Sequence, residues 1–315
     1  MNSGKVSKYH KSEKKYFEDC RVQVNEHFIE IEKLSIRIRV LTAGNGSPLL
    51  FVHGAPAAAA IWMPLIRNLQ GYLNIMIDRP GCGLSEKTSY KALSRDQLQS
   101  IMVSTIDAVL DHFKIPQVPV VSSSFGSGLT LLYALKKAGR ISKLVIEGAP
   151  ALINGTHVPS FMKPMLLPGL RWLIPRLPTT TAIMKKIMIG LGHRHSIEQQ
   201  VITTAFINWY ISLFNNSRTQ VNEISMIIIA YPLGKAKQSF ILSDEEIEDI
   251  KQPTLLLWST DDPFGGIQTA QRFKTKLNNA LLIPFENSGH LPWLDKPEIH
   301  AEEIKKFIGS RPEDA

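Results

Sequence analysis

Short apolar segments of strand length alternate with segments of helical length along most of this sequence. Four of the apolar segments are continuous, as in strands buried on both faces: LLFVHG (49–54), LNIMIDRPG (73–81), KLVIEGAP (143–150) and PTLLLWS (253–259). Helices are expected at 95–113, 125–139, 266–278 and 297–308. This alternation predicts an α/β fold, with a mainly parallel sheet covered by helices on both faces.

Further strands are expected at both ends of the alternation and in its middle: FIEIE (28–32), IRIRV (36–40), VPVVSSS (118–124) and ALLIPF (280–285). Between 151 and 240 the strand pattern is lost, and prolines break the segment into several short helices. The sequence therefore predicts four parts: a polar, frayed N-terminal extension (1–25), the first part of an α/β core (26–150), a helical cap insertion (151–240) and the second part of the core (241–315).

The net charge of +8 is unevenly placed along the 315 residues. Residues 148–197 contain six Lys or Arg and no Asp or Glu, and long apolar runs such as FMKPMLLPGLRWLIPRLP lie between the basic residues. Few polar side chains that read base edges occur there, so we expect no nucleic-acid partner. The segment fits a cap over an apolar pocket or a peripheral contact with anionic lipid. A solvated basic face is the alternative.

Other features of the sequence bound the class of protein. No run of 18 apolar residues occurs, so no transmembrane segment is expected, and the charged N-terminus lacks the apolar middle of a signal peptide. Two cysteines, Cys20 and Cys82, exclude a disulfide framework, and a cytoplasmic location is expected. No cluster has metal-ligand spacing and the Gly81/Gly83 pair lacks a phosphate-loop tail, so we expect no metal and no cofactor. The sequence leaves the oligomeric state open.

Polar residues directly after strands are the candidates for chemistry, because ligands of such sheets bind at the carboxyl ends of the strands. SSSFG (122–126) joins a strand to a helix in the form small-x-Ser-x-small, which a tight turn with an exposed apex requires. That register makes Ser124 the apex and a candidate nucleophile. A serine needs a base, and His290 in SGH, after the strand ALLIPF, is the candidate.

Two further segments supply what such a pair needs. A carboxylate in WSTDDP (258–263) would fix the imidazole tautomer. Backbone N–H groups after HG (53–54), at Ala55, and at Phe125 would bind an oxyanion, and Phe125 lies at a helix N-terminus, where the helix dipole favours negative charge. His53 is expected to be a hydrogen-bonded turn residue, and Asp78 and Arg79 are expected to hold the turn after the fourth strand.

These motifs together resemble the α/β-hydrolase superfamily over roughly residues 28–310: HGAP (53–56), DRPGCGLS (78–85), SSSFGS (122–127), WSTDDP (258–263) and SGHLPWLDKPE (288–298), in the family order. The resemblance implies an eight-stranded, mostly parallel sheet with a helical cap after the sixth strand. It also implies a triad of Ser124, Asp262 and His290, with Asp261 and Glu147 as competing acids. The sequence departs from the family where Ser122 and Ser123 replace the common Gly and His.

The serine apex favours acyl transfer over the chemistry of branches that use an aspartate nucleophile. The expected function is hydrolysis of a small-molecule carboxylic ester with an apolar or lipid-like part, through an acyl-enzyme. A C–C bond hydrolase or a perhydrolase with the same triad, a cyanohydrin lyase and a slow-turnover ligand receptor are the alternatives, since the fold hosts several activities. Candidate pocket residues are Phe161, Met162, Trp172, Trp209 and Trp293, with ordinary core packing as the alternative for each.

Overall fold

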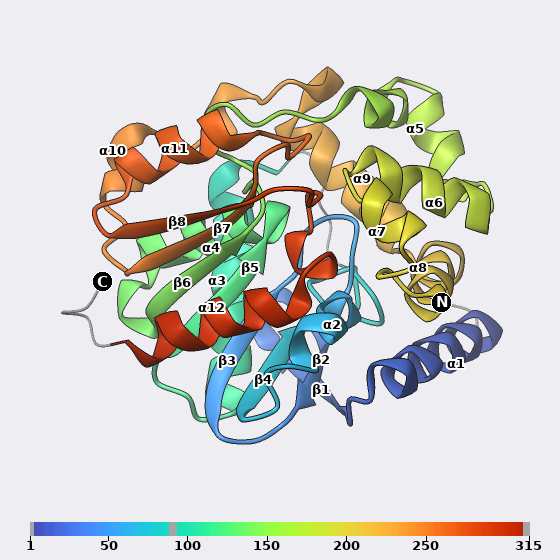
Figure 1. Ribbon diagram of the computed structural model, residues 1–315, viewed down its shortest axis with the longest axis horizontal. Helices are drawn as coiled ribbons and strands as arrows, with labels where there is room; N and C mark the ends of the chain where they lie inside the picture. The colour runs from blue at the N-terminus through green and yellow to red at the C-terminus, as the bar shows by residue number, and fades with distance from the viewer. Residues whose placement is uncertain (1–2, 88–92, 311–315) are drawn as a thin grey trace.

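A computed structural model describes residues 3–87 and 93–310 of the chain (Figure 1). Eight strands of this described part form one sheet in the order β1-β2-β4-β3-β5-β6-β7-β8. Their bounds are β1 Asn25–Ile31, β2 Ile36–Ala43, β3 Ser47–Val52, β4 Tyr72–Ile77, β5 Val118–Ser123, β6 Ile141–Glu147, β7 Thr254–Ser259 and β8 Ala280–Phe285. Strand β2 pairs antiparallel with β1 and β4, and all other pairs are parallel. The predicted fold class is confirmed.

Alternate residues of the central strands enter two separate cores. In β3, Leu50 and Val52 pack on one face of the sheet, while Leu49 and Phe51 pack on the other, and all four are fully buried. This double burial explains the continuous apolar run in the sequence, because a strand covered on both faces has no solvent side. Because β3, β5, β6, β7 and β8 run parallel, their carboxyl ends lie along one edge of the sheet.

Helices of the core cover both faces of this sheet. The larger ones are α3 (Arg95–His112), α4 (Ser124–Lys136), α11 (Ile267–Lys276) and α12 (Pro297–Gly309), and the short α2 (Met63–Ile66) follows the 3-10 turn η2 (Ala59–Trp62). The core on one face includes residues of α3, α4 and α11, and the core on the other includes residues of α2 and α12. Helix α3 begins with a capping box formed by Ser94 and Gln97.

All elements between β6 and β7 are helical, where the sequence predicts a helical insertion. They are η4 (Ser160–Leu166), α5 (Leu170–Leu173), η5 (Ile174–Arg176), α6 (Thr181–Gly190), α7 (Arg194–Glu198), α8 (Thr204–Asn216), α9 (Thr219–Ala230), η6 (Pro232–Gly234), η7 (Gln238–Phe240) and α10 (Asp244–Glu248). Figure 1 shows α5 to α9 gathered at one side of the molecule, beyond the ends of the strands. We call the elements from η4 to α9 the cap.

The N-terminal segment differs from the frayed extension that the sequence predicts. Residues Ser3–Cys20 form helix α1, which packs against α8 of the cap (Figure 1). Its buried face carries Tyr9, Glu13 and Tyr16, and the Glu13 carboxylate pairs with buried Arg39 of β2. The prediction of a frayed extension was wrong because the partners that hold α1 lie on β2 and α8, outside the segment itself. Residues 1–2 and 311–315 of the predicted terminal parts lie outside the described residues.

Three other findings concern cysteines, membranes and metals. Cys20 and Cys82 are both buried and free. None of the helices in the described ranges is long and apolar enough to cross a bilayer. Within the same ranges, no three His, Cys, Asp or Glu side chains gather in a way that could hold a metal ion.

Candidate active site

Ser124 stands at the turn from β5 into α4, in the left-handed backbone conformation with a φ of 51°. A non-glycine residue in this region is uncommon, and it marks the strained turn that presents an apex side chain above a sheet. The turn needs Gly126, because a Cβ there would lie 2.3 Å from the carbonyl oxygen of His53. The tight approach of α4 to the end of β3 therefore positions Ser124.

The three consecutive serines have different surroundings. The Ser122 hydroxyl donates to the carbonyl oxygen of Val145 at 3.4 Å, within the sheet. The Ser123 hydroxyl oxygen accepts the backbone N–H of Gly54 at 3.1 Å. Ser124 lines both of the cavities described below, whereas Ser123 lines only the larger one. The geometry thus favours Ser124 over its two neighbours as the apex of the turn.

His290 and Asp262 form a buried pair next to this turn. Nδ1 of His290 lies 2.8 Å from Oδ2 and 2.9 Å from Oδ1 of Asp262. Asp262 is itself held by backbone donors, since its Oδ2 accepts the N–H of Ala149 and its Oδ1 accepts the N–H of Phe264. The Phe264 ring stacks on the imidazole at 4.0 Å between centroids. These contacts fix the position and plane of the imidazole.

The pairing with Asp262 assigns the roles of the two imidazole nitrogens. Nδ1 donates its proton to the carboxylate, which leaves Nε2 as the basic nitrogen. Nε2 is buried and has no hydrogen-bond partner within the described ranges, and His290 lines the larger cavity together with Ser124. Ser124 and His290 thus line the same cavity, and His290 has a basic nitrogen without a hydrogen-bond partner among the described residues.

The two competing acids lie elsewhere. Asp261 is exposed, and its carboxylate accepts the neighbouring Thr260 hydroxyl. Glu147 is fully buried and pairs with Nδ1 of His300 at 2.8 Å. Burial raises the pKa of Glu147, and the His300 charge and hydrogen bond oppose this rise. Of the three carboxylates, Asp262 is the one that the structure places against His290.

A buried arginine holds the loop that carries Ala55. Arg79 donates through Nε to the carbonyl oxygen of His53 at 2.9 Å and through an Nη to that of Gly54 at 3.0 Å. The same guanidinium pairs with Glu223 of α9, so the ion pair joins the loop to the cap. His53 is buried and accepts the N–H of Arg79 in this turn. Burial, aided by the Arg79 charge, lowers the pKa of His53.

The loop of His290 is attached to the cap as well. The N–H of His290 donates to the carbonyl oxygen of Leu191 at 2.8 Å. His193, fully buried at the start of α7, contacts both carboxylate oxygens of Asp295 through Nδ1, and its Nε2 accepts the N–H of Leu291 at 3.3 Å. Asp295 also accepts the N–H of Gly289. Cap residues therefore support the backbone on either side of His290.

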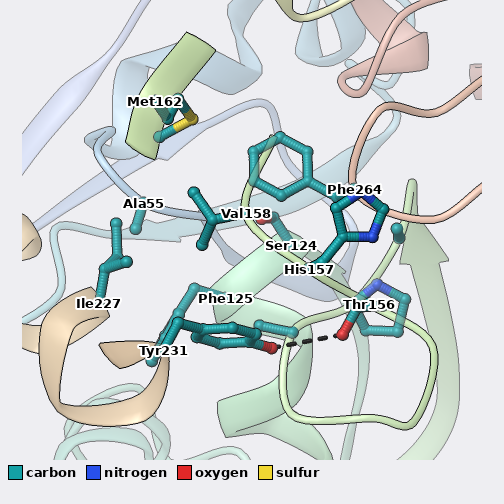
Figure 2. Close-up of a pocket in the computed structure, with 13 residues that line it drawn as sticks. Ala55, Ser124, Phe125, Thr156, His157, Val158, Met162, Ile227, Tyr231 and Phe264 are labelled. Carbon is teal, nitrogen blue, oxygen red and sulfur yellow. Dashed lines mark hydrogen bonds between the residues drawn. The ribbon is translucent and has the colours of Figure 1, made fainter. Parts of the chain in front are cut away.

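Two cavities meet at Ser124, and Ala55, Met162 and Phe264 also line both. The larger, with an empty volume of about 740 Å³, is bordered by cap residues such as Met165, Tyr210 and Phe214. The smaller, of about 420 Å³, is shown in Figure 2, where Phe125, Val158 and Ile227 are among the side chains around it and Tyr231 hydrogen-bonds Thr156. Both linings are mainly apolar.

Comparison with known proteins agrees with this architecture. The family described as "alpha/beta hydrolase fold" matches residues 47–182. The chain has the fold of the α/β-hydrolase superfamily. It is 26% identical over 271 residues to an uncharacterized hydrolase, YugF, of Bacillus subtilis. This alignment covers 82% of this chain and 89% of that protein.

Two further proteins are similar to this chain. A 2-hydroxy-6-oxononadienedioate/2-hydroxy-6-oxononatrienedioate hydrolase of Paraburkholderia phymatum is 25% identical, covering 87% of this chain and 91% of the relative. The crystal structure of a naproxen esterase from Bacillus subtilis superposes with a TM-score of 0.67 at 17% identity, covering 98% of this chain and all of that structure. The proteins similar to this chain thus include one named as a hydrolase of an oxo-dioate and one named as an esterase, and the likeness to the latter shows the fold alone.

The predicted pocket residues differ in their surroundings in the structure. Phe161 and Met162 line the larger cavity. Trp172 is 63% exposed, whereas Trp209 stacks on Tyr16 and Trp293 stacks on Trp62, both fully buried. None of these three tryptophans lines either cavity, so their prediction was wrong. A large aromatic side chain finds enough apolar contact in a core without a ligand.

Several lining residues were missed by the sequence analysis. Met165, Ile187, Leu191, Tyr210 and Phe214 come from the cap, where nothing in a single sequence separates pocket lining from core. Phe264 had a usable signal, because it lies two residues after Asp262 in the segment that follows β7. His193 and Asp295 had no such sequence signal, because 102 residues separate these two partners.

Proposed function

We propose that this α/β-hydrolase is a serine esterase that hydrolyses uncharged, small-molecule carboxylic esters with apolar groups. One observation carries the proposal: Ser124 lines two mainly apolar cavities, and the Asp262-bound His290, whose Nε2 has no hydrogen-bond partner among the described residues, lines the larger one as well. An ester places its acyl and alcohol parts on opposite sides of the reacting carbonyl. Two cavities that share Ser124 as a lining residue offer one space for each of these parts.

In the proposed reaction, the Ser124 hydroxyl oxygen attacks the ester carbonyl carbon while Nε2 of His290 accepts the hydroxyl proton. Asp262 stabilises the imidazolium that forms, through the bonds at Nδ1. The tetrahedral oxyanion is bound by the N–H groups of Ala55 and Phe125. Phe125 is the second residue of α4, in the first helical turn, where N–H groups lack intrahelical partners.

The second half of the reaction uses the same groups. The His290 imidazolium protonates the departing alkoxide, which leaves as the alcohol, and Ser124 remains acylated. Nε2 then removes a proton from water, whose oxygen attacks the acyl carbon. Collapse of the second tetrahedral intermediate returns the proton to the Ser124 oxygen and releases the carboxylic acid.

Hydrolysis of a C–C bond is the second candidate, and the similarity to the 2-hydroxy-6-oxononadienedioate hydrolase favours it. That relative is named for a dioate, a substrate with two carboxylates. Among the described residues that line the two cavities, none is a lysine or arginine. A carboxylate buried there would lose hydration without gaining a cationic partner, which favours the uncharged ester.

The test compares hydrolysis of uncharged short- and long-chain aryl esters by the wild type and Ser124→Ala. We expect kcat to fall by about 10⁴- to 10⁶-fold in Ser124→Ala and to stay near the wild-type value in Ser122→Ala, the matched control. Labelling with a fluorophosphonate and peptide mapping should place the modification on Ser124. Equal ester hydrolysis by wild type and Ser124→Ala would refute the proposed activity.

A second comparison separates the two candidate reactions. The wild type is assayed on an uncharged aryl ester and on a 2-hydroxy-6-oxo-dienoate. The proposal predicts a higher kcat/KM for the ester, and a higher kcat/KM for the dienoate would replace the esterase by the C–C hydrolase.

A further inference from the structure

The cap exposes an unusual group of large apolar side chains. Leu167, Leu170, Trp172, Leu173 and Leu177 are between 39% and 63% exposed. They lie within eleven consecutive positions, and every residue from 167 to 173 is exposed. Contacts of α5 with both η4 and η5 keep this stretch together. Figure 1 shows α5 at the outer side of the cap, away from the sheet.

Basic side chains lie among these apolar ones. Lys163 of η4, Arg171 of α5 and Arg176 of η5 are exposed. The Arg176 guanidinium sits 4.7 Å from the centroid of the Trp172 ring. We call these three basic residues and the five apolar residues above the cap patch.

Among the described residues, the segments that form the cap patch carry no acidic side chain. The sequence from 148 to 197 has no Asp or Glu, and the one acid of the adjacent α9 is Glu223, which is buried against Arg79. None of the ion pairs among the described residues uses Lys163, Arg171 or Arg176. The positive charge of the patch is therefore available to an external anionic surface.

We propose that the cap patch docks on the surface of an anionic phospholipid bilayer. Leucine and tryptophan side chains enter the boundary between headgroups and acyl chains, while lysine and arginine attract anionic headgroups. A second copy of the chain fits less well, because two facing patches would oppose their basic residues. The complementarity of charge, together with the exposed apolar area, selects the bilayer.

Docking would also bring the larger cavity to the bilayer. Phe161, at the start of η4, is 40% exposed and lines that cavity. Met165 of the same element lines it too. An apolar ester dissolved in the membrane would then reach Ser124 from the side of η4. This consequence rests on the proposed esterase activity, whereas docking itself does not.

Trp172 makes the proposal measurable without a label. The other four tryptophans, Trp62, Trp209, Trp258 and Trp293, are fully buried, so Trp172 dominates quenching by soluble quenchers. Vesicles of phosphatidylcholine mixed with phosphatidylglycerol should shift its emission to the blue and protect it from iodide. Phosphatidylcholine vesicles should have a much smaller effect. Raising the ionic strength from about 0.1 M to about 1 M should release the protein, because the Debye length falls from about 10 Å to about 3 Å.

Variants assign the binding to the cap patch, with flotation measuring the partition coefficient. Leu170→Ser and Leu173→Ser should each lower it by about tenfold, and Lys163→Gln and Arg171→Gln by about fivefold each. Leu281→Ser, at an exposed leucine of β8, is the matched control and should bind as the wild type does. Trp172→Phe should keep binding and lose the emission shift.

Three results would overturn the proposal. The first is that the wild type does not bind vesicles that contain phosphatidylglycerol. The second is that Leu170→Ser and Leu173→Ser bind such vesicles as well as the wild type does. The third is that the wild type self-associates in sedimentation and these two variants do not. Hydrolysis of a soluble short-chain ester is measured on the same proteins. Normal vesicle binding without ester hydrolysis would refute the esterase and leave the docking surface intact.

Discussion

Three adjacent serines differ in what their hydroxyl groups contact, and this difference could not be read from their residue type. The small-x-Ser-x-small spacing selects Ser124 because only residues without bulk fit two positions before and after the apex. The structure adds the physical detail: Gly126 packs against the carbonyl oxygens of Val52 and His53, and Ser123 is tied to Gly54. The spacing thus carried the essential steric information.

The adjacent aspartates Asp261 and Asp262 allow a matched test of the acid. Asp262→Asn should lower kcat for ester hydrolysis by about 10⁴-fold, because an amide at this position favours the wrong imidazole tautomer. Asp261→Asn should keep kcat close to the wild-type value, since its side chain is exposed. Steady-state kinetics on one aryl ester checks both. Equal losses in the two variants would contradict the assignment of Asp262.

At the scale of elements, the loop of His290 depends on helix α7. His193→Ala removes the bonds to Asp295 and to the N–H of Leu291. We expect kcat to fall by about ten- to a hundredfold, because small displacements of a catalytic group have effects of this size, with a smaller change in KM. Arg194→Ala, at the exposed neighbour, should leave both unchanged.

A positioning role for His193 is separable from a loss of folding. The rate of fluorophosphonate labelling, measured well below the unfolding temperature, should fall with kcat in His193→Ala. His193→Gln should recover part of it, because an amide can still hydrogen-bond Asp295. A His193→Ala protein that is less stable yet labels at the wild-type rate would show that His193 supports folding alone.

The contact between His193 and Asp295 predicts that the stability of the protein depends on pH. Burial alone would raise the pKa of Asp295, but the hydrogen bonds and charge of His193, with the bonds from Ser196 and Gly289, hold this pKa below its ordinary value. The folded state therefore favours the carboxylate. Its contribution to stability is present above the ordinary aspartate pKa of about 3.9 and is lost as pH falls through the lower folded value.

Urea unfolding of the wild type and Asp295→Asn across that pH range measures this contribution. The wild type should be the more stable protein near neutral pH, and the difference should shrink as the pH falls below about 4. Glu298→Gln, at an exposed carboxylate three residues away, is the control and should follow the wild type. A difference that stays constant between neutral and acid pH would contradict the assignment to Asp295.

For the whole molecule, local patterns predict the sheet better than they predict the contacts between distant parts. Continuous apolar runs identify β3, β4, β6 and β7 because burial on both faces leaves no other pattern. Residues that follow the parallel strands β5, β7 and β8 reach one edge of the sheet by topology alone, so Ser124, Asp262 and His290 could be predicted to lie at the same edge. The cap is different, because an apolar helix residue looks alike in the core and in a pocket.

Helix α1 shows the same limit most clearly. Its sequence is polar, and the buried residues Tyr9, Glu13, Tyr16 and Cys20 are spaced along one helical face. Glu13 is acceptable there because Arg39 of β2 pairs with it and the Tyr9 hydroxyl donates to its carboxylate. Tyr16 stacks on Trp209 of α8, and Tyr210 and Phe214 of α8 line the larger cavity. The N-terminal helix therefore supports the wall of the candidate site from outside.

Removing the Tyr16 ring tests this support. Tyr16→Ala should lower the free energy of unfolding by about 3–5 kcal/mol, the range for deleting a buried aromatic ring, whereas exposed Lys15→Ala should change it by less than about 0.5 kcal/mol. Because α8 would lose its packing partner, KM for long-chain esters should rise in Tyr16→Ala at temperatures where the protein stays folded. Chemical unfolding and steady-state kinetics measure the two effects. If Tyr16→Ala and Lys15→Ala had the same free energy of unfolding and the same KM, the packing of α1 on α8 would have no energetic consequence. Helix α1 would then contribute nothing to the cap.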